Sequence, residues 1–243
     1  MSALVLKIIA CVAMLIDHIG FQYGIMAFRA IGRIAFPIFV YLLCNGYKHT
    51  SNRRRYALRL AVFAILSQIP FSLFCYGVYF QNHGNVMFTL LMAFLCIWSA
   101  DELWNNPKLR WIFLLPTVIV FFAYHLGWMS SDYGAKGILL ALVFYFFDGR
   151  SFSKRVLTAI GMLIAVYYKF ILALAGGLAQ YAFTMNFVMP QLSQWERYQA
   201  FSLLALIFIF GYNGKKGKYS GKILQYGFYA FYPLHQLVLW LIR

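Results

Sequence analysis

Residues 11–24 read CVAMLIDHIGFQYG, and they place Asp17 and His18 side by side within an apolar run. The run extends over residues 3–25, which is long enough to cross a lipid bilayer as a helix. A charged side chain at the centre of a membrane costs about 2.5–3.5 kcal/mol on insertion scales, so it usually faces a partner or a watered cavity. Asp17 and His18 are therefore candidate functional residues, and their partners should lie at a similar depth.

The composition places the whole chain in the helical membrane class. It has 243 residues, of which 63% are hydrophobic and only 11% are charged. A soluble domain of this length could not keep so much apolar surface away from water. The formal net charge is +15, but the basic residues cluster in short loops, where they orient a membrane protein and meet anionic lipid. We therefore expect a membrane lipid environment and no nucleic-acid partner.

The cysteines offer no sign of metal binding. All four, Cys11, Cys44, Cys75 and Cys96, lie within apolar runs and form no Cys-x-x-Cys pair. Such thiols are usually inert and buried. We expect neither a metal site nor a disulfide framework.

Nine apolar runs predict membrane spans. The predicted fold is all-α, a polytopic bundle of about nine transmembrane helices in a single domain over residues 1–243. The run 176–192 is interrupted by Gly176, Gly177, Asn186 and Pro190, and we interpret it as an interfacial or re-entrant segment. The predicted spans are residues 3–25, 29–48, 56–77, 85–101, 109–126, 134–148, 154–175, 198–213 and 223–242.

The distribution of basic residues predicts the orientation. Alternate loops are rich in Lys and Arg, whereas the loops near 78–84, 127–133 and 176–197 are almost free of them. By the positive-inside rule, the N-terminus is cytoplasmic and the C-terminus external. The basic loops carry Lys48, Arg53, Arg54, Arg55 and Arg59; Lys108 and Arg110; Arg150, Lys154 and Arg155; and Lys215, Lys216, Lys218 and Lys222.

With these directions assigned, the polar residues of the spans gather in one layer in the outer half of the membrane. Arg29 and Arg33 are one helical turn apart and share a face of the second span, so either can pair with Asp17. Asp17 could then be part of an ion pair that only fixes helix packing. His83 and His125 could be plain interfacial histidines, and Lys136 could simply extend toward the interface. The layer consists of Asp17, His18, Arg29, Arg33, His83, Asn85, His125, Asp132, Lys136 and His235.

The ninth span adds a second histidine inside a predicted helix. In QYGFYAFYPLHQLVLW, Tyr232 and His235 are three residues apart and share a helical face. Pro233 lies between them and predicts a kink, because it cannot bond to the carbonyl of Tyr229. Two histidines within spans, with an acid and two arginines at their depth, exceed what packing requires.

Five blocks, in order, resemble those of the TraX family. They are KIIACVAMLIDHIG, RAIGRIAFPIFVYLLCNGYKHTSNRRRYALRL, GNVMFTLLMAF, SDYGAKGILL and FYPLHQ. That family is named for the inner-membrane enzyme that N-acetylates the first residue of F-type conjugative pilin. It also looks like a branch of the membrane acyltransferases, which carry acyl groups from cytoplasmic acyl-CoA to acceptors across the membrane. A histidine in the membrane is their catalytic base, and its position in the LIDHIG block implies His18 here.

The resemblance implies an acyl-CoA-dependent O- or N-acetyltransferase of the bacterial inner membrane, with acetyl-CoA as donor. The acceptor would be an amine or hydroxyl of a peptide, glycan or small molecule, including a pilin-like N-terminus. Acyl transfer needs a base and a positive group for the developing oxyanion. We assign catalysis to His18, Asp17, His235 and Tyr232; cofactor binding to Arg29, Arg33, Arg53, Arg55 and Arg59; and substrate binding to Asn85, Asp132 and Lys136.

Two further assignments stay open at this point. Asp17 points about 100° away from His18 on a helix, so it pairs with an arginine rather than orienting the histidine. Asn85 is an alternative to His235 and Tyr232 for the second proton-handling or oxyanion group. One competing function is a proton-coupled transporter of a small molecule or lipid, in which Asp17, His18 and His235 relay protons. Another is a non-catalytic membrane assembly subunit, in which the buried pairs only lock the helices together. Acetyl-CoA-dependent labelling of an acceptor separates the enzyme from both.

Overall fold

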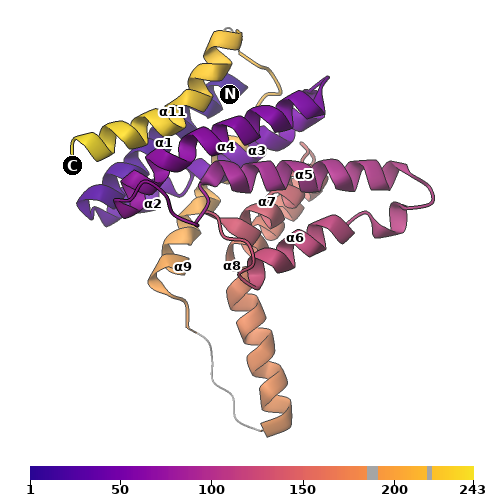
Figure 1. The fold of residues 1–243 in the computed structure, drawn as a ribbon. Coiled ribbons are helices and arrows are strands. Elements are labelled where there is room, and N and C mark those ends of the chain that lie inside the picture. Colours follow the sequence, from indigo (N-terminus) through magenta and orange to yellow (C-terminus); the bar gives the residue numbers. More distant parts are fainter. Residues whose placement is uncertain (185–190, 218–220) are drawn as a thin grey trace.

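A computed structural model describes residues 1–184, 191–217 and 221–243 (Figure 1). Within these ranges the fold is all-α, with no β-strand, as the sequence predicts. A single β-bridge joins Gly84 to Ser131 and holds two loops together. The helices are α1 Ala3–Tyr23, α2 Met26–Gly32, α3 Ala35–His49, α4 Arg53–Tyr76, α5 Val86–Asn105, α6 Leu115–His125, α7 Gly134–Phe147, α8 Phe152–Thr184, α9 Gln194–Gln199, α10 Ala205–Phe210 and α11 Lys222–Leu241, with short 3-10 helices at Arg110–Ile112 and Ala200–Leu204.

Five segments of the described chain are long and apolar enough to cross a membrane, which confirms that this is a membrane protein. They are Ala3–Tyr23, Met26–His49, Arg53–Tyr76, Val86–Asn105 and Phe152–Ala179. Each of the nine predicted spans contains helix, but α6 and α7 have only 11 and 14 residues. The predicted span 198–213 consists of short helical pieces. The count of nine spans and the orientation of the termini remain predictions.

The α8 helix is longer than the sequence predicts. It continues through Gly176 and Gly177 to Thr184, whereas the predicted span ends at residue 175. A glycine in a helix costs only about 1 kcal/mol relative to alanine, so two glycines without a proline do not end it. The first part of the predicted interfacial segment is therefore a continuation of α8, which extends beyond the other helices in Figure 1. Asn186 and Pro190 lie outside the described residues.

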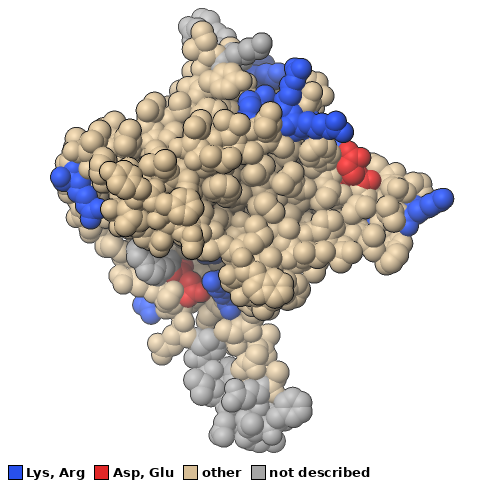
Figure 2. All heavy atoms as spheres, viewed as in Figure 1, with Lys and Arg blue, Asp and Glu red and all other residues tan. Residues whose placement is uncertain are grey.

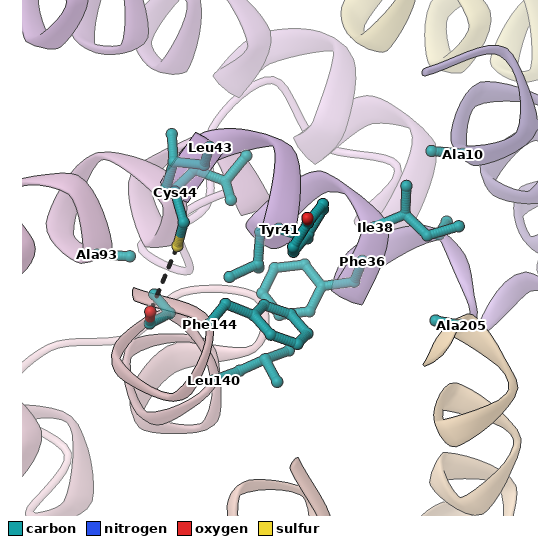
Figure 3. Packing of buried hydrophobic residues seen from close by; sticks show 14 of the residues in the cluster. Ala10, Phe36, Ile38, Tyr41, Leu43, Cys44, Ala93, Leu140, Phe144 and Ala205 are labelled. Carbon is teal, nitrogen blue, oxygen red and sulfur yellow. Dashed lines mark hydrogen bonds between the residues drawn. The ribbon is translucent and has the colours of Figure 1, made fainter. Parts of the chain in front are cut away.

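The α3 helix is the centre of the packing. Its buried residues surround the whole helix, and a helix that is apolar on all sides is one enclosed by protein. Figure 3 shows Tyr41 and Cys44 of α3 beside Phe144 of α7, with Ala93 of α5 and Ala205 of α10 nearby. The thiol of Cys44 donates to the carbonyl of Ala141 at 3.3 Å. All four cysteines are free thiols.

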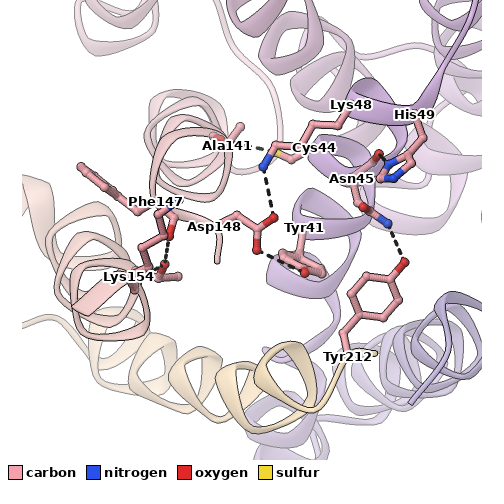
Figure 4. Close-up of polar contacts among 11 residues, drawn as sticks. Tyr41, Cys44, Asn45, Lys48, His49, Ala141, Phe147, Asp148, Lys154 and Tyr212 are labelled. Atoms are coloured by element: carbon pink, nitrogen blue, oxygen red, sulfur yellow. Dashed lines mark hydrogen bonds and ion pairs between the residues drawn. The ribbon is translucent and has the colours of Figure 1, made fainter. Parts of the chain in front are cut away.

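Polar contacts join the helices at the end of α3. Lys48 pairs with Asp148 at 3.1 Å, and the Asn45 amide donates to the hydroxyl of Tyr212 at 2.8 Å (Figure 4). At the start of α4, Arg53 pairs with Asp101 at 2.7 Å. Lys and Arg form small patches on the face shown in Figure 2, separated by wide uncharged surface. The two ion pairs and the hydrogen bond bring the end of α3 and the start of α4 close to the end of α5 and to the loops that follow α7 and α10.

Candidate active-site cavity

Asp17 lies between two arginines. Its Oδ2 accepts from Nη1 of Arg29 at 2.7 Å, and its Oδ1 accepts from Nη2 of Arg33. Asp17 and Arg33 are both buried, and Arg33 Nε also donates to the carbonyl of Arg29 at 3.1 Å. The sequence predicts one partner for Asp17, and the structure provides both. Asp132, a second carboxylate, lines the same end of the cavity as Asp17 and the two arginines.

A tight turn brings these groups together. The α1 helix ends at Gly24, which adopts the left-handed conformation with φ 69°. Such a φ is favourable mainly for glycine. The Ile25 amide donates back to the carbonyl of Gly20 at 2.9 Å, and α2 then returns alongside α1. Arg29 in α2 and Arg33 directly after it therefore reach the depth of Asp17.

His18 faces away from Asp17 and contacts the last helix. Its Nδ1 lies 2.5 Å from Nε2 of His235, and the two rings are parallel within 4°, with centroids 4.8 Å apart. Nδ1 of His235 donates to the carbonyl of Phe231 at 2.7 Å. The structure thus joins two histidines, from α1 and α11, that the sequence could place only at a similar depth.

A cavity of about 830 Å³ lies between α1, α3, α4 and α11. Lys7 and His18 both line it, and they are eleven residues apart on α1, a separation of about 16 Å along the helix. The cavity therefore extends over about half the thickness of a hydrocarbon core of about 30 Å. Its volume is in the range of ligand pockets, about 300–1,000 Å³.

The two ends of the cavity differ in charge. Lys7, His49, Arg59 and Lys216 line one end, and no acidic side chain of the described chain lines that end. Lys7 lies over the ring of Phe228 at 5.5 Å, and Arg59 lies over the ring of Tyr56 at 5.2 Å. The other end carries both signs of charge and is lined by Asp17, His18, Arg29, Arg33, His83, Asp132 and Tyr232.

Three of the residues at the basic end were not predicted from the sequence. They are Lys7, His49 and Lys216. Lys7 could have been found, because eleven residues of helix bring it to within about 20° of His18 around the axis. His49 and Lys216 lie at the end of α3 and in the loop after α10, and nothing in their local sequence indicates a shared cavity.

The arginines at the start of α4 separate into two groups. Arg59 lines the cavity. Arg53 is instead held by Asp101 and by Glu102, at 2.7 and 2.9 Å, and Arg55 is exposed. The predicted cofactor contacts of Arg53 and Arg55 therefore have no support in the geometry, since neither side chain belongs to the cavity wall in the described residues.

Asn85 supports the fold rather than the cavity. It is fully buried, and its amide donates to the carbonyl of Ala64 at 2.7 Å and to Gln68 Oε1 at 3.0 Å. Its Oδ1 accepts from the Met87 amide at 3.0 Å and so caps α5. The polar atoms of the Asn85 side chain thus bond to α4 and α5. Asn85 does not line the cavity that the described residues form.

Asp132 and Lys136, the other predicted substrate residues, differ in position. Asp132 lies in the loop before α7 and lines the cavity. Its carboxylate makes no hydrogen bond or ion pair with any described residue. Burial raises the pKa of the Asp132 carboxyl above its ordinary value, while the positive charge of Arg33 opposes this change. Lys136 is in the first turn of α7 and is outside the cavity lining.

The two other histidines of the predicted polar layer differ in position. His83 lines the cavity, and its Nδ1 bonds to the Ser130 hydroxyl at 2.6 Å. His125 ends α6 and stacks on Phe121 instead.

Across the described ranges, no three His, Cys, Asp or Glu side chains come together in a way that could hold a metal ion.

These features define a polytopic helical membrane protein with a buried ion cluster and a histidine pair at one end of an internal cavity. The family described as TraX protein matches residues 2–243 of this sequence. The chain therefore belongs to the TraX family. It is also similar to the "Probable fimbrial assembly protein FimC, serogroup H1" of Dichelobacter nodosus, with 27% identity over 96% of this chain and 92% of that protein. No solved structure matches it.

Proposed function

We propose that this protein is a membrane acetyltransferase that moves an acetyl group from acetyl-CoA to an amine or hydroxyl of an acceptor. The observation that carries the proposal is the cavity itself, because it connects a purely basic end with the His18–His235 pair. A donor with an anionic head and a long neutral arm fits this distribution of charge. The basic end is the cytoplasmic end in the proposed orientation.

The basic end suits the phosphates of the donor. Lys7, Arg59 and Lys216 have no acidic side chain beside them in the cavity wall, so phosphate oxygens can supply their counter-charge. The pantetheine arm then has to cover the distance of about 16 Å between Lys7 and His18. The mostly aromatic and aliphatic wall between them, including Leu60 and Phe39, suits a neutral chain. Acetyl-CoA supplies the activated acetyl thioester.

At the other end, His18 is the general base. It takes the proton of the acceptor N–H or O–H as the acceptor nitrogen or oxygen bonds to the thioester carbonyl. The carbon–sulfur bond then breaks, and the His18 imidazolium returns the proton to the leaving CoA thiolate. The guanidinium groups of Arg29 and Arg33 line this end of the cavity and favour the developing oxyanion. Tyr232 lines the same end and offers a hydroxyl donor.

The acceptor enters at the end that holds Asp132. A carboxylate that faces the cavity favours a protonated amine, which gives one proton to the Asp132 carboxylate before it attacks. The similarity to a protein named for fimbrial assembly supports a pilin-like peptide N-terminus as that amine. An inner-membrane location follows from the same proposal, since acetyl-CoA is cytoplasmic and pilin assembly takes place across that membrane.

Transfer of labelled acetyl groups tests the proposal. The protein, reconstituted in nanodiscs of phosphatidylethanolamine and phosphatidylglycerol, is incubated with radiolabelled acetyl-CoA and a synthetic pilin-like peptide. We expect label on the peptide with a free N-terminus and none on the same peptide with a blocked N-terminus. Label on a glycan or hydroxyl acceptor instead would retain the acetyltransferase and change its acceptor. Absence of transfer to every acceptor would overturn the proposal, and absence of acetyl-CoA binding as well would favour the transporter.

A further inference from the structure

We infer that His235 is a positioning residue, which holds His18 in the tautomer whose Nε2 is free of a proton. The catalytic part of this inference rests on the proposed function, but the tautomer itself does not. The inference depends on a chain of three groups: the Phe231 carbonyl, the His235 imidazole and the His18 imidazole. The direction of each hydrogen bond follows from the chemistry of the group before it.

The first bond determines the tautomer of His235. A carbonyl oxygen only accepts, so the 2.7 Å contact between Phe231 O and His235 Nδ1 requires the proton on Nδ1. A neutral imidazole carries one N–H, and Nε2 of His235 is then an acceptor. His235 cannot reverse this arrangement without losing its bond to the helix backbone.

The second bond transfers this constraint to His18. Because Nε2 of His235 accepts, Nδ1 of His18 at 2.5 Å must be the donor. Nε2 of His18 then carries the lone pair, and it makes no hydrogen bond with any residue of the described ranges. His18 lines the cavity, so this nitrogen is the one available to a substrate. The opposite tautomer would offer an N–H, which is not a base.

The surroundings favour this neutral, oriented pair. The ring of Phe231 stacks on His235 with centroids 4.9 Å apart, and Phe74 packs against His18 at 5.2 Å. The guanidinium groups of Arg29 and Arg33 in the neighbouring ion cluster disfavour a further positive charge on the pair. When His18 takes a proton on Nε2, its Nδ1–H still donates to His235, so no second proton transfer is needed. His235 thus orients the base and supports the imidazolium that forms, as the buried partner does in a catalytic triad.

Nitrogen NMR of the ¹⁵N-histidine-labelled protein measures the tautomer without any substrate. The chain has five histidines, and His18→Ala and His235→Gln identify the signals of the pair. We expect His18 with its proton on Nδ1 in the unmodified protein and in His235→Gln, whose side-chain oxygen can replace Nε2 as acceptor. In His235→Leu, with no acceptor, His18 should show a mixture of both tautomers. A proton on Nε2 of His18 in the unmodified protein would overturn the inference.

The same variants separate positioning from direct catalysis. With acetyl-CoA and the peptide acceptor, His235→Leu should lower kcat by about 10- to 100-fold, a fraction of the full general-base effect, with the affinity for acetyl-CoA unchanged. His235→Gln should recover most of the turnover. Leu234→Ala, at an exposed neighbouring position, controls for damage to α11. Equal loss in both His235 variants, with the fold intact, would mean that His235 reacts with the substrate itself and would overturn the positioning role.

One further combination of results would contradict the proposed function but not the inferred tautomer. If the NMR spectra show the tautomer inferred here but the unmodified protein transfers no acetyl group, the histidine chain is confirmed and the acetyltransferase proposal fails. Failure of the tautomer inference and failure of the acetyltransferase proposal therefore give different results with the same samples.

Discussion

Gly32 packs directly against Asp17. A Cβ atom at position 32 would overlap the Cβ of Asp17 and lie 2.6 Å from its Oδ1 and 2.7 Å from its Cα. The absence of a side chain at Gly32 lets α2 approach α1 closely enough for both arginines to reach one carboxylate. The ion cluster beside His18 thus depends on a residue that has no polar group of its own.

Gly32→Ala should therefore separate α1 from α2 and weaken the ion cluster. Overpacking costs about 1–3 kcal/mol, and loss of the buried ion pair adds to this. We expect a clear decrease in the thermal unfolding temperature in detergent, together with a loss of acetyl transfer. The control is Gly227→Ala in α11, where an added Cβ would meet no atom within 4 Å and stability should stay the same or increase. Equal stability of both variants would contradict the close approach.

Replacing either of the two cavity carboxylates by an amide should change the stability of the protein, but in opposite directions. Asp17→Asn removes the buried carboxylate that both arginines contact and should cost about 3–5 kcal/mol. Asp132→Asn should leave stability the same or raise it, because a raised pKa means that folding disfavours the ionised carboxyl. This gain in stability should diminish as the pH falls through the pKa of Asp132, because the side chain is then already neutral in the unmodified protein. Thermal unfolding of the two variants between pH 4 and 8 measures both effects.

Asp132→Asn should still reduce activity toward an amine. Its carboxylate faces the cavity without a partner in the described chain, so we expect a higher KM for the peptide acceptor and an unchanged Kd for acetyl-CoA. Steady-state kinetics at varied peptide concentration give the KM. An unchanged KM would place the acceptor elsewhere in the cavity.

His18→Ala should separate catalysis from folding. His18 contributes no ion pair, so the variant should fold, insert and bind acetyl-CoA, but lose turnover by about 10²–10⁴-fold. His125→Ala is the matched control, because His125 stacks on Phe121 and lies outside the cavity lining; its turnover should not change. Near-normal turnover in His18→Ala would exclude His18 as the base.

Two arginines of the same helix test the donor site. Arg59 lines the cavity, whereas Arg55, one turn earlier on α4, is exposed. Arg59→Gln should raise the Kd for CoA by about 10- to 100-fold, because a hydrogen bond to a charged group contributes about 1.5–3 kcal/mol. Arg55→Gln should leave it unchanged. Calorimetry at two salt concentrations should also show weaker binding by the unmodified protein at high salt. If both substitutions act equally, the phosphates bind to the exposed basic loop and not in the cavity.

Fusions of reporter proteins test the orientation that the basic loops predict. A fusion at Lys216 should lie in the cytoplasm and a fusion at Arg243 outside it. Alkaline phosphatase activity, which appears only outside the cytoplasm, distinguishes the two positions. If both fusions report the same side, the predicted crossing by the last helix is wrong.

Much of the fold could be predicted from the sequence, because in a membrane the length and polarity of a segment limit what it can be. Long apolar runs must form helices, since lipid offers no partner for the backbone. The position of a residue along a spanning helix also gives its depth in the membrane, because each residue advances the helix by 1.5 Å. Five polar residues could therefore be assigned to one layer: Asp17, His18, Arg29, Arg33 and His235. The structure brings all five together, and all of them except His235 line the cavity.

The rotation of each helix about its axis, and the helix it faces, were decided only by the tertiary structure. The His18–His235 contact joins residues 217 positions apart, and no local pattern records it. For the same reason the sequence could not show that Asp101 binds Arg53 or that the amide of Asn85 bonds to a carbonyl of α4. Polarity along a span reports depth, whereas the choice of neighbour depends on how the side chains of several helices pack at once.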